Sequence, residues 1–169
     1  WSSQKGASRC NKVPPGFHLV ELVVIECQAN HYCEGEAEPE MLCLAGWSSE
    51  KGASRCNKVP PGFHLVGTVV KECQANHYCP GEAEPEKSCL AGTSSEKGST
   101  KCHACSAGMY SDTVGKECTN CEIGSARNGT DHEATKCRRC NLGETTSVAG
   151  ASTCEKCDLG RYGNAQGTC

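Results

Sequence analysis

The spacing of the cysteines constrains this chain more than any other feature. From Cys89 to Cys169, five consecutive segments open with the pattern Cys-x-x-Gly, and each reaches its next cysteine after 11 to 15 intervening residues. The intervening loops carry Gly, Ser, Thr, Asn and Asp, which are the residues that turns favour. Such a ladder predicts short loops closed by disulfides instead of one large hydrophobic core.

The composition also favours a disulfide scaffold. The 169 residues include 17 cysteines, aromatic residues make up 5%, and the 37% of hydrophobic residues includes the cysteines. A chain with so little to bury needs covalent cross-links, and these persist in oxidising compartments. We therefore expect an extracellular or cell-surface location. The expected fold is small and disulfide-rich, an elongated tandem array of short β-hairpins or irregular modules with little or no helix.

Some partners and segments are not expected. No stretch approaches the roughly 18 apolar residues of a membrane-spanning helix, and the net charge of −3 without a basic patch argues against nucleic-acid binding. The chain has no initiator Met or signal peptide and opens at the start of a repeat, so we interpret it as a segment of a longer protein.

Residues 1–46 and 47–92 are nearly the same sequence, repeated with a period of 46. A third copy begins at Thr93 and diverges after Cys102, and a fixed period of this size is typical of an array whose units contact mainly their neighbours. We predict four segments: repeat 1 (1–46), repeat 2 (47–92), the third repeat start with the first Cys-x-x-Cys module (93–121), and further Cys-x-x-Cys modules (122–169). The two full copies differ at Gln4/Glu50, Glu21/Gly67, Leu22/Thr68, Ile25/Lys71, Glu34/Pro80, Met41/Lys87 and Leu42/Ser88.

The sequence of each full copy predicts a β-hairpin. In the second copy, two four-residue strands are expected on either side of Gly67-Thr68, because Gly at the first central position suits a type II′ turn. Glu21-Leu22 takes this place in the first copy and suits the turn less well. In the ladder, we expect residues 109–111 to pair with 116–118 as another two-stranded ribbon.

Parity favours one pairing of the cysteines. If each Cys-x-x-Gly cysteine closes on the next cysteine and the others pair in order, only Cys10 is left over, and by the period its partner lies upstream of Trp1. On the chain-entropy model each loop of about 12 to 15 residues contributes roughly 3 kcal/mol. This sequential phase gives the pairs Cys27–Cys33, Cys43–Cys56, Cys73–Cys79, Cys89–Cys102, Cys105–Cys118, Cys121–Cys137, Cys140–Cys154 and Cys157–Cys169.

A competing phase stays open at this point, because sequence alone does not exclude it. This competing phase leaves Cys169 for a downstream partner and interleaves the pairs in the ladder. We favour the sequential phase because its short local loops leave no crossed connections. Upstream of the ladder, the competing phase pairs Cys10–Cys27, Cys33–Cys43, Cys56–Cys73 and Cys79–Cys89.

The cysteine pattern resembles the ephrin-receptor-like repeats of extracellular surface proteins, through Cys-x-x-Cys-x-x-Gly-x-Tyr-Ser at 102–111. It is also similar, more loosely, to tumour necrosis factor receptor modules. Residues 73–81 followed by 89–93 resemble variants of these repeats in large surface proteins of protists and algae. The resemblance implies an extracellular architecture that receptors, adhesins and fibrous proteins share.

Zinc is the strongest rival to disulfides. Two pairs of Cys-x-x-Cys motifs have spacings that suit Cys₄ sites, but the same Cys-x-x-Gly pattern occurs at Cys43 and Cys89 without a second such pair. We therefore predict no metal and no cofactor. The sulfurs concerned are those of Cys102, Cys105, Cys118 and Cys121, and of Cys137, Cys140, Cys154 and Cys157.

Few residues point to a binding or modification site. Asn128 lies in the only N-glycosylation sequon, mid-loop between two cysteines. Trp1 and Trp47 recur at the start of each copy, where each either covers a disulfide or forms an exposed contact with a neighbouring chain or glycan. The acidic loops 34–40 and 81–86 lack the ligand pattern of a calcium loop, and the four repeated histidines, His18, His31, His64 and His77, are interpreted as structural or surface residues.

No catalytic motif is present, so we do not expect an enzyme. The expected function is that of a structural, disulfide-stapled, glycosylated extracellular repeat protein, a subunit of a surface fibre, appendage or coat that associates with copies of itself. The alternative is the ectodomain of a receptor or adhesin that binds a protein ligand.

Overall fold

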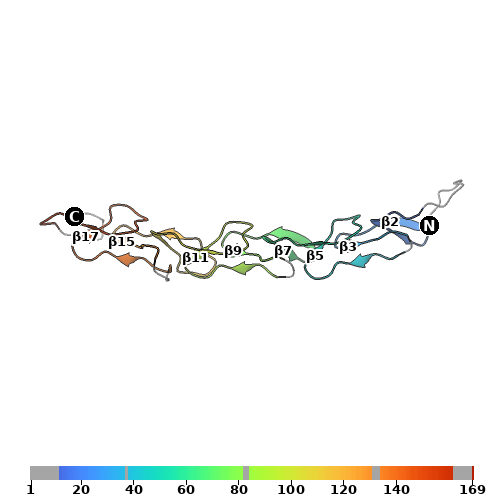
Figure 1. Cartoon of the computed structure of the whole chain (residues 1–169), viewed down its shortest axis with the longest axis horizontal. Helices are drawn as coiled ribbons and strands as arrows, with labels where there is room; N and C mark the ends of the chain where they lie inside the picture. Colours follow the sequence, from blue (N-terminus) through green and yellow to red (C-terminus); the bar gives the residue numbers. More distant parts are fainter. Residues whose placement is uncertain (1–11, 37, 82–83, 131–133, 162–168) are drawn as a thin grey trace. The chain divides into compact units, whose positions relative to one another are not determined.

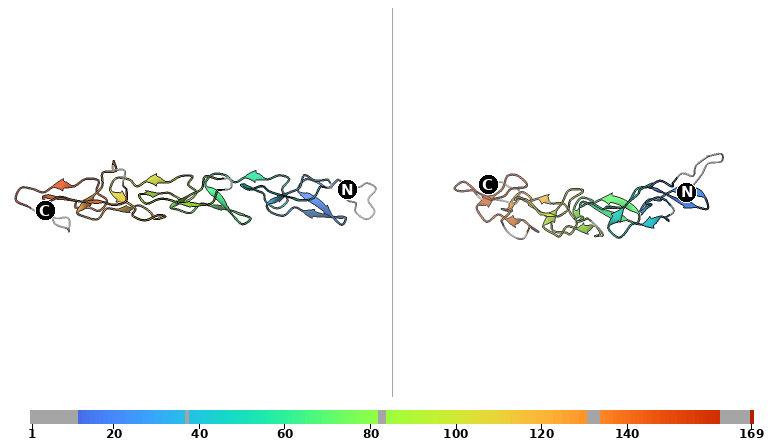
Figure 2. Two further views of the ribbon diagram at one scale, coloured as in Figure 1. Left: turned by 90° about the horizontal axis from the view of Figure 1, so that it is seen from below. Right: turned by 45° about the vertical axis from the view of Figure 1, so that its right-hand side comes forward.

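The structure, a computed structural model, describes residues 12–36, 38–81, 84–130, 134–161 and 169. These residues form eighteen short strands, which pair as nine separate two-stranded antiparallel sheets (Figure 1). Both views in Figure 2 show arrows and loops but no coiled ribbon, in agreement with the absence of helix from the described residues. The predicted class, a disulfide-rich tandem array of β-hairpins, is confirmed.

Two of the hairpins have four-residue strands. In the first copy, β1 (Phe17–Val20) pairs with β2 (Val23–Glu26), and in the second copy β7 (Phe63–Val66) pairs with β8 (Val69–Glu72). The seven other hairpins have two-residue strands. They are β3 (His31–Tyr32) with β4 (Met41–Leu42), β5 (Trp47–Ser48) with β6 (Asn57–Lys58), β9 (His77–Tyr78) with β10 (Lys87–Ser88), β11 (Thr93–Ser94) with β12 (His103–Ala104), β13 (Met109–Tyr110) with β14 (Thr119–Asn120), β15 (Ser125–Ala126) with β16 (Arg138–Arg139), and β17 (Glu144–Thr145) with β18 (Glu155–Lys156).

One four-residue turn motif precedes each of the nine hairpins and occurs once more at 157–160. Its last residue has a positive φ, and the N–H that follows donates to the carbonyl of its second residue at 3.0–3.2 Å, as in a type II turn. Glycine fills this last position in eight motifs because it adopts positive φ without steric cost, and Asn30 and Asn76 fill it in the other two. The ten motifs are 13–16, 27–30, 43–46, 59–62, 73–76, 89–92, 105–108, 121–124, 140–143 and 157–160.

The motifs are therefore more numerous than the Cys-x-x-Gly pattern indicates. Each 46-residue copy contains three, reading Val-Pro-Pro-Gly, Cys-Gln-Ala-Asn and Cys-Leu-Ala-Gly. In the first of these, Val13 and Val59 take the cysteine position and are 2% and 1% exposed. The proline at the third position suits the turn because its φ is already fixed near the required value.

Backbone hydrogen bonds join neighbouring motifs. In five motifs, the N–H of the turn residue with positive φ donates to a carbonyl in the next motif's hairpin, three residues after that motif's own turn residue. Gly16 donates to Cys33 at 2.8 Å, and Gly108 donates to Arg127 at 2.7 Å. The same bond joins Asn30 to Ser49, Asn76 to Ser95 and Gly92 to Ser111. These five bonds each join a motif to its neighbour, as expected for a repeat array.

The core is made mainly of sulfur and small side chains. Seven cysteines, two valines and two alanines are the buried hydrophobic residues among those described. Large apolar side chains such as Leu22, Leu42 and Leu44 are instead mostly exposed. The buried hydrophobic residues are Val13, Cys27, Cys33, Val59, Cys73, Cys79, Cys89, Cys105, Cys121, Ala126 and Ala134.

Both predicted repeat hairpins form, but their turns differ. Gly67 has φ +62° and Thr68 is not among the residues with positive φ, which agrees with the predicted type II′ turn. Glu21 and Leu22 both have positive φ, at +47° and +71°, as a type I′ turn requires. The first copy therefore closes its hairpin with the other of the two favoured turns.

The predicted ribbon in the ladder was wrong in register. Met109 pairs with Asn120 and Tyr110 with Thr119, not with residues 116–118. The reason is that Cys118 must reach Cys105 and the N–H of Gly115 donates to the carbonyl of Cys89. These bonds hold 115–118 outside the strand.

The described residues divide into two compact units. One contains the residues up to Glu72 together with those of Pro80–Pro85, and the other contains Cys73–Cys79 and the residues from Glu86 onward. No helix in the described part of the chain is long and apolar enough to cross a membrane.

Candidate functional site

The described cysteines form eight disulfides, and these are the eight pairs of the sequential phase. Two close loops with a sequence separation of 6, and six close loops with separations of 12 to 16. The two sulfurs of each Cys-x-x-Cys motif belong to different disulfides, so neither is a thiolate that could bind zinc. Cys10, which was predicted to pair upstream, lies outside the described residues.

Three of the four repeated histidines lie close to backbone carbonyls or a disulfide. His18 Nδ1 lies 3.5 Å from Cys33 Sγ, beside the buried Cys27–Cys33 disulfide. His31 Nδ1 and His77 Nδ1 lie 3.2 Å and 3.1 Å from the carbonyls of Ala29 and Ala75. A disulfide sulfur is a poor metal ligand, so the packing of His18 is structural.

An open apolar groove of about 440 Å³ surrounds Trp47, where the first copy ends and the second begins. Trp47 is 37% exposed, and Lys58 Nζ lies 5.7 Å from the centroid of its ring. The groove includes Cys56 of the Cys43–Cys56 disulfide, so one tryptophan borders a disulfide and also presents an exposed surface. Trp1 lies outside the described residues. The groove is lined by Tyr32, Met41, Leu42, Leu44, Trp47, Arg55 and Cys56.

Some carboxylates of the acidic loops accept hydrogen bonds within the fold. Glu40 accepts the backbone N–H of Gln28 at 3.1 Å, and Glu86 accepts that of Gln74 at 2.6 Å. Lys12 donates to Glu36 at 2.8 Å, and this hydrogen bond, together with the charge of Lys12, lowers the pKa of Glu36.

Asn128 follows the buried end of β15 and is exposed. Its Oδ1 accepts the backbone N–H of Thr130 at 3.1 Å. The carboxamide nitrogen that an N-linked glycan would modify is therefore on an exposed loop, and the sequon residues are held in a local turn.

Sequence reasoning missed Arg127, a buried residue that holds the backbone of the preceding motif. It is 3% exposed, and its Nη1 donates to the carbonyls of Cys105, Ser106 and Met109 at 2.8–3.0 Å. The residue stands third after the turn glycine Gly124, and that position carries Ser49, Ser95 and Ser111 in other motifs. The recurrence of a polar residue at this position is the sequence signal that could have revealed it.

Asn30 forms a socket for the hairpin of the second copy. It is 7% exposed, and its Nδ2 donates to the carbonyl of Thr68, at the turn between β7 and β8. The tip of one hairpin thus folds back onto an Asn turn motif that precedes it in the chain.

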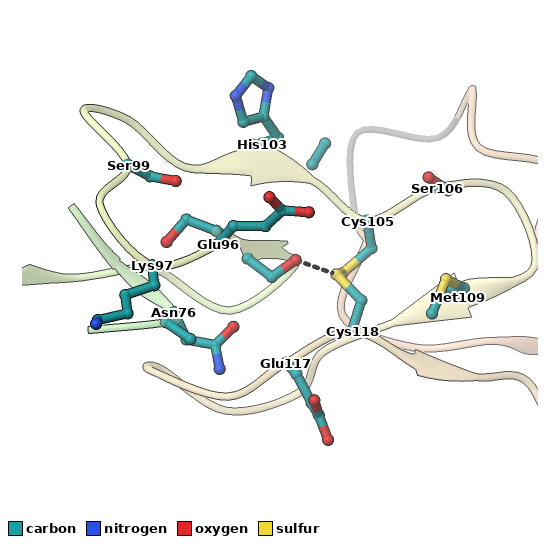
Figure 3. Close-up of a pocket in the computed structure, with 14 residues that line it drawn as sticks. Asn76, Glu96, Lys97, Ser99, His103, Cys105, Ser106, Met109, Glu117 and Cys118 are labelled. Carbon is teal, nitrogen blue, oxygen red and sulfur yellow. Dashed lines mark hydrogen bonds between the residues drawn. A yellow bond between two sulfur atoms is a disulfide. The ribbon is translucent and has the colours of Figure 1, made fainter. Parts of the chain in front are cut away.

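In the second copy, the corresponding turn motif, which ends in Asn76, faces an open hollow. Asn76 borders a hollow of about 690 Å³, which Figure 3 shows with Glu96, Lys97 and Glu117 around the Asn76 carboxamide. Within the described residues this carboxamide makes no hydrogen bond. The hollow is lined by Ala75, Asn76, Ser94, Ser95, Glu96, Lys97, Ser99, His103, Ala104, Cys105, Ser106, Met109, Glu117 and Cys118.

Comparisons with protein-family models and with curated proteins find no match to this chain. The architecture is that of a cysteine-rich repeat protein built from small hairpins with many disulfides.

Proposed function

We propose that this chain is a structural, disulfide-stapled extracellular repeat protein that associates with copies of itself in a surface fibre, appendage or coat. The observation that carries the proposal is the repetition of one turn motif ten times among the described residues, with backbone hydrogen bonds between neighbouring motifs inside each compact unit. Such an array provides length and mechanical continuity without requiring a large core. We propose no catalytic activity.

Disulfides and one sequon support the extracellular part of this proposal. Disulfide-rich small modules persist in oxidising compartments, and the asparagine of the sequon, Asn128, is exposed. The spacing resemblance to ephrin-receptor-like repeats fits the same location. We therefore propose secretion to the cell surface and glycosylation at Asn128.

A receptor or adhesin ectodomain is the second candidate. The groove around Trp47 favours it, because an exposed aromatic side chain bordered by apolar residues and an arginine is typical of protein-binding surfaces. The two candidates differ in what occupies the exposed surface: copies of the same chain in the first, and a different protein in the second.

Mass and assembly measurements test the proposal. Non-reducing intact mass, with and without reduction and alkylation after glycan release, should show eight disulfides, and protein from a secreting eukaryotic cell should carry a glycan that Asn128→Gln removes. Sedimentation velocity over a wide concentration range, followed by electron microscopy, should show concentration-dependent polymers. Many free thiols with bound zinc would overturn the extracellular proposal, and a strictly monomeric protein at high concentration would overturn self-association.

A further inference from the structure

The tip of the first hairpin resembles a docking element without a partner in the described chain. Leu22 is 83% exposed at this tip, although its φ of +71° is unfavourable for a bulky side chain. The corresponding tip of the second copy, Gly67-Thr68, bonds Asn30 through the carbonyl of Thr68. One tip is therefore docked on an Asn turn motif, and Leu22 at the other tip is exposed.

The hollow at Asn76 is the counterpart of the site where the second tip docks. Asn76 lies 46 residues after Asn30, and its neighbours Ser94–Lys97 repeat Ser48–Lys51 without a substitution. The chain beyond Cys102 no longer follows the repeat, and the hairpins described there have two-residue strands. The loop of the next motif instead turns toward Cys89, whose carbonyl accepts the N–H of Gly115 at 2.8 Å. The position that a hairpin tip would fill is left open.

We infer that the tip Glu21-Leu22 of one molecule docks in the Asn76 hollow of a second copy. The contact reproduces the one within the chain: Asn76 Nδ2 donates to the backbone carbonyl of Leu22, and the Leu22 side chain covers the apolar part of the hollow near Met109. Burial of an apolar side chain and satisfaction of a half-buried carboxamide both favour the complex. This inference rests on the self-association in the proposed function and names its contact.

The geometry also determines the kind of assembly. The described chain has one free tip, in its first copy, and one open Asn socket, in its second. A tip and a socket are different surfaces, so their contact is heterologous, and a heterologous contact that does not close into a ring continues as an open filament. A single repeated contact thus suffices to build a fibre.

Sedimentation velocity of the full chain and four matched variants tests the contact. Asn76→Gly removes the carboxamide and keeps the turn, because Gly fills this position in eight other motifs. Leu22→Asp places a carboxylate where the tip would approach Glu96 and Glu117. The controls Asn30→Gly and Thr68→Asp make the same changes at the contact within the chain. Non-reducing mass of each variant verifies its eight disulfides.

The expected result is about tenfold weaker self-association for each of Asn76→Gly and Leu22→Asp, as loss of one hydrogen bond or one apolar contact predicts. The two controls should associate like the parent chain. Carbodiimide treatment of mixed ¹⁴N- and ¹⁵N-labelled protein should also yield a mixed-isotope cross-link between Glu21 and Lys97.

Two outcomes would contradict the inference, and they are distinguishable. Self-association that neither Asn76→Gly nor Leu22→Asp weakens would overturn this contact and leave the proposed function standing. A parent chain that does not self-associate at any accessible concentration would overturn both.

Discussion

The two full copies share one framework and differ on their surfaces. Among the described residues, every position at which they differ is exposed except Met41, which is half-buried. The turn motifs are identical in both, and the long hairpins have the same register, Phe17 opposite Glu26 and Phe63 opposite Glu72. The framework therefore fixes the fold, while a few exposed substitutions decide which surfaces are apolar.

Those substitutions affect two surfaces of the first copy together. Leu22 makes the hairpin tip apolar, and Met41 and Leu42 line the groove at Trp47. The second copy has Thr68, Lys87 and Ser88 at these positions, and Thr93 follows it where Trp47 follows the first copy. Two copies of one module thus provide different contact surfaces without any change in the backbone pattern that supports them.

The largest expected effect comes from a comparison of two glycines, one in the framework and one at a tip. A Cβ at Gly16 would lie 2.2 Å from the backbone carbonyl oxygen of Gly52, and its φ is +87°. We expect Gly16→Ala to cost more than about 3 kcal/mol of unfolding free energy. Gly67→Ala meets no atom within 4 Å and should cost about 1 kcal/mol through its φ alone. Urea unfolding followed by far-UV circular dichroism measures both. Equal losses would show that the framework is no more constrained than the tip.

The next largest effect on stability comes from a comparison of Arg127, in the ladder, with Ser95. Both residues stand third after the glycine of their turn motif. Arg127→Met leaves three carbonyls without their donor in a buried site and should cost about 3 kcal/mol. Ser95→Ala removes one bond, from Ser95 Oγ to the carbonyl of His77 at 2.5 Å, and should cost about 1 kcal/mol. Amide hydrogen exchange of residues 105–127 reports the first change locally. Exchange as slow as in the parent would contradict the role given to Arg127.

These differences also show what the sequence could and could not predict. The disulfide-rich hairpin array followed from the cysteine spacing, and the second-copy hairpin from Gly67. The turns ending in Asn30 and Asn76 were not recognised, although Asn is among the non-glycine residues that best tolerate positive φ. The Val-Pro-Pro-Gly motif was missed because a buried valine replaces the cysteine.

The hollow at Asn76 and the hydrogen-bond partners of Arg127 were beyond sequence reasoning for a different reason. Both depend on which carbonyls and loops of a neighbouring motif approach the residue, and local pattern does not specify that. The ribbon at Met109 failed for the same reason, since a disulfide and a bond to the preceding motif determine its register.

A smaller effect, opposite in sign between the copies, tests the two turn types. Leu22→Gly removes the strain of a bulky residue at φ +71° and should raise the unfolding free energy by about 1 kcal/mol. The matched change Thr68→Gly meets no positive φ, so the added freedom of the unfolded chain should lower the stability by about 0.5 to 1 kcal/mol. Thermal unfolding of the two variants checks the signs. Two changes of the same sign would mean that the turns are not of different types.

The smallest effect concerns an exposed ion pair of the first copy. Lys12 and Glu36 contact each other at 2.8 Å, whereas the corresponding Lys58 lies over the ring of Trp47. The hydrogen bond from Lys12 lowers the pKa of Glu36, so the pair stabilises the fold above the pKa of the unfolded carboxyl, and this contribution is lost as the pH falls through the folded pKa. Lys12→Gln should therefore raise the pKa of Glu36 in a ¹³C-detected titration, and should lower the melting temperature slightly at pH 7 but not below the folded pKa. Because both side chains are mostly exposed, added salt should reduce the difference at pH 7. A melting-temperature difference that persists in acid would assign the effect of Lys12 to packing of its aliphatic chain and not to its charge.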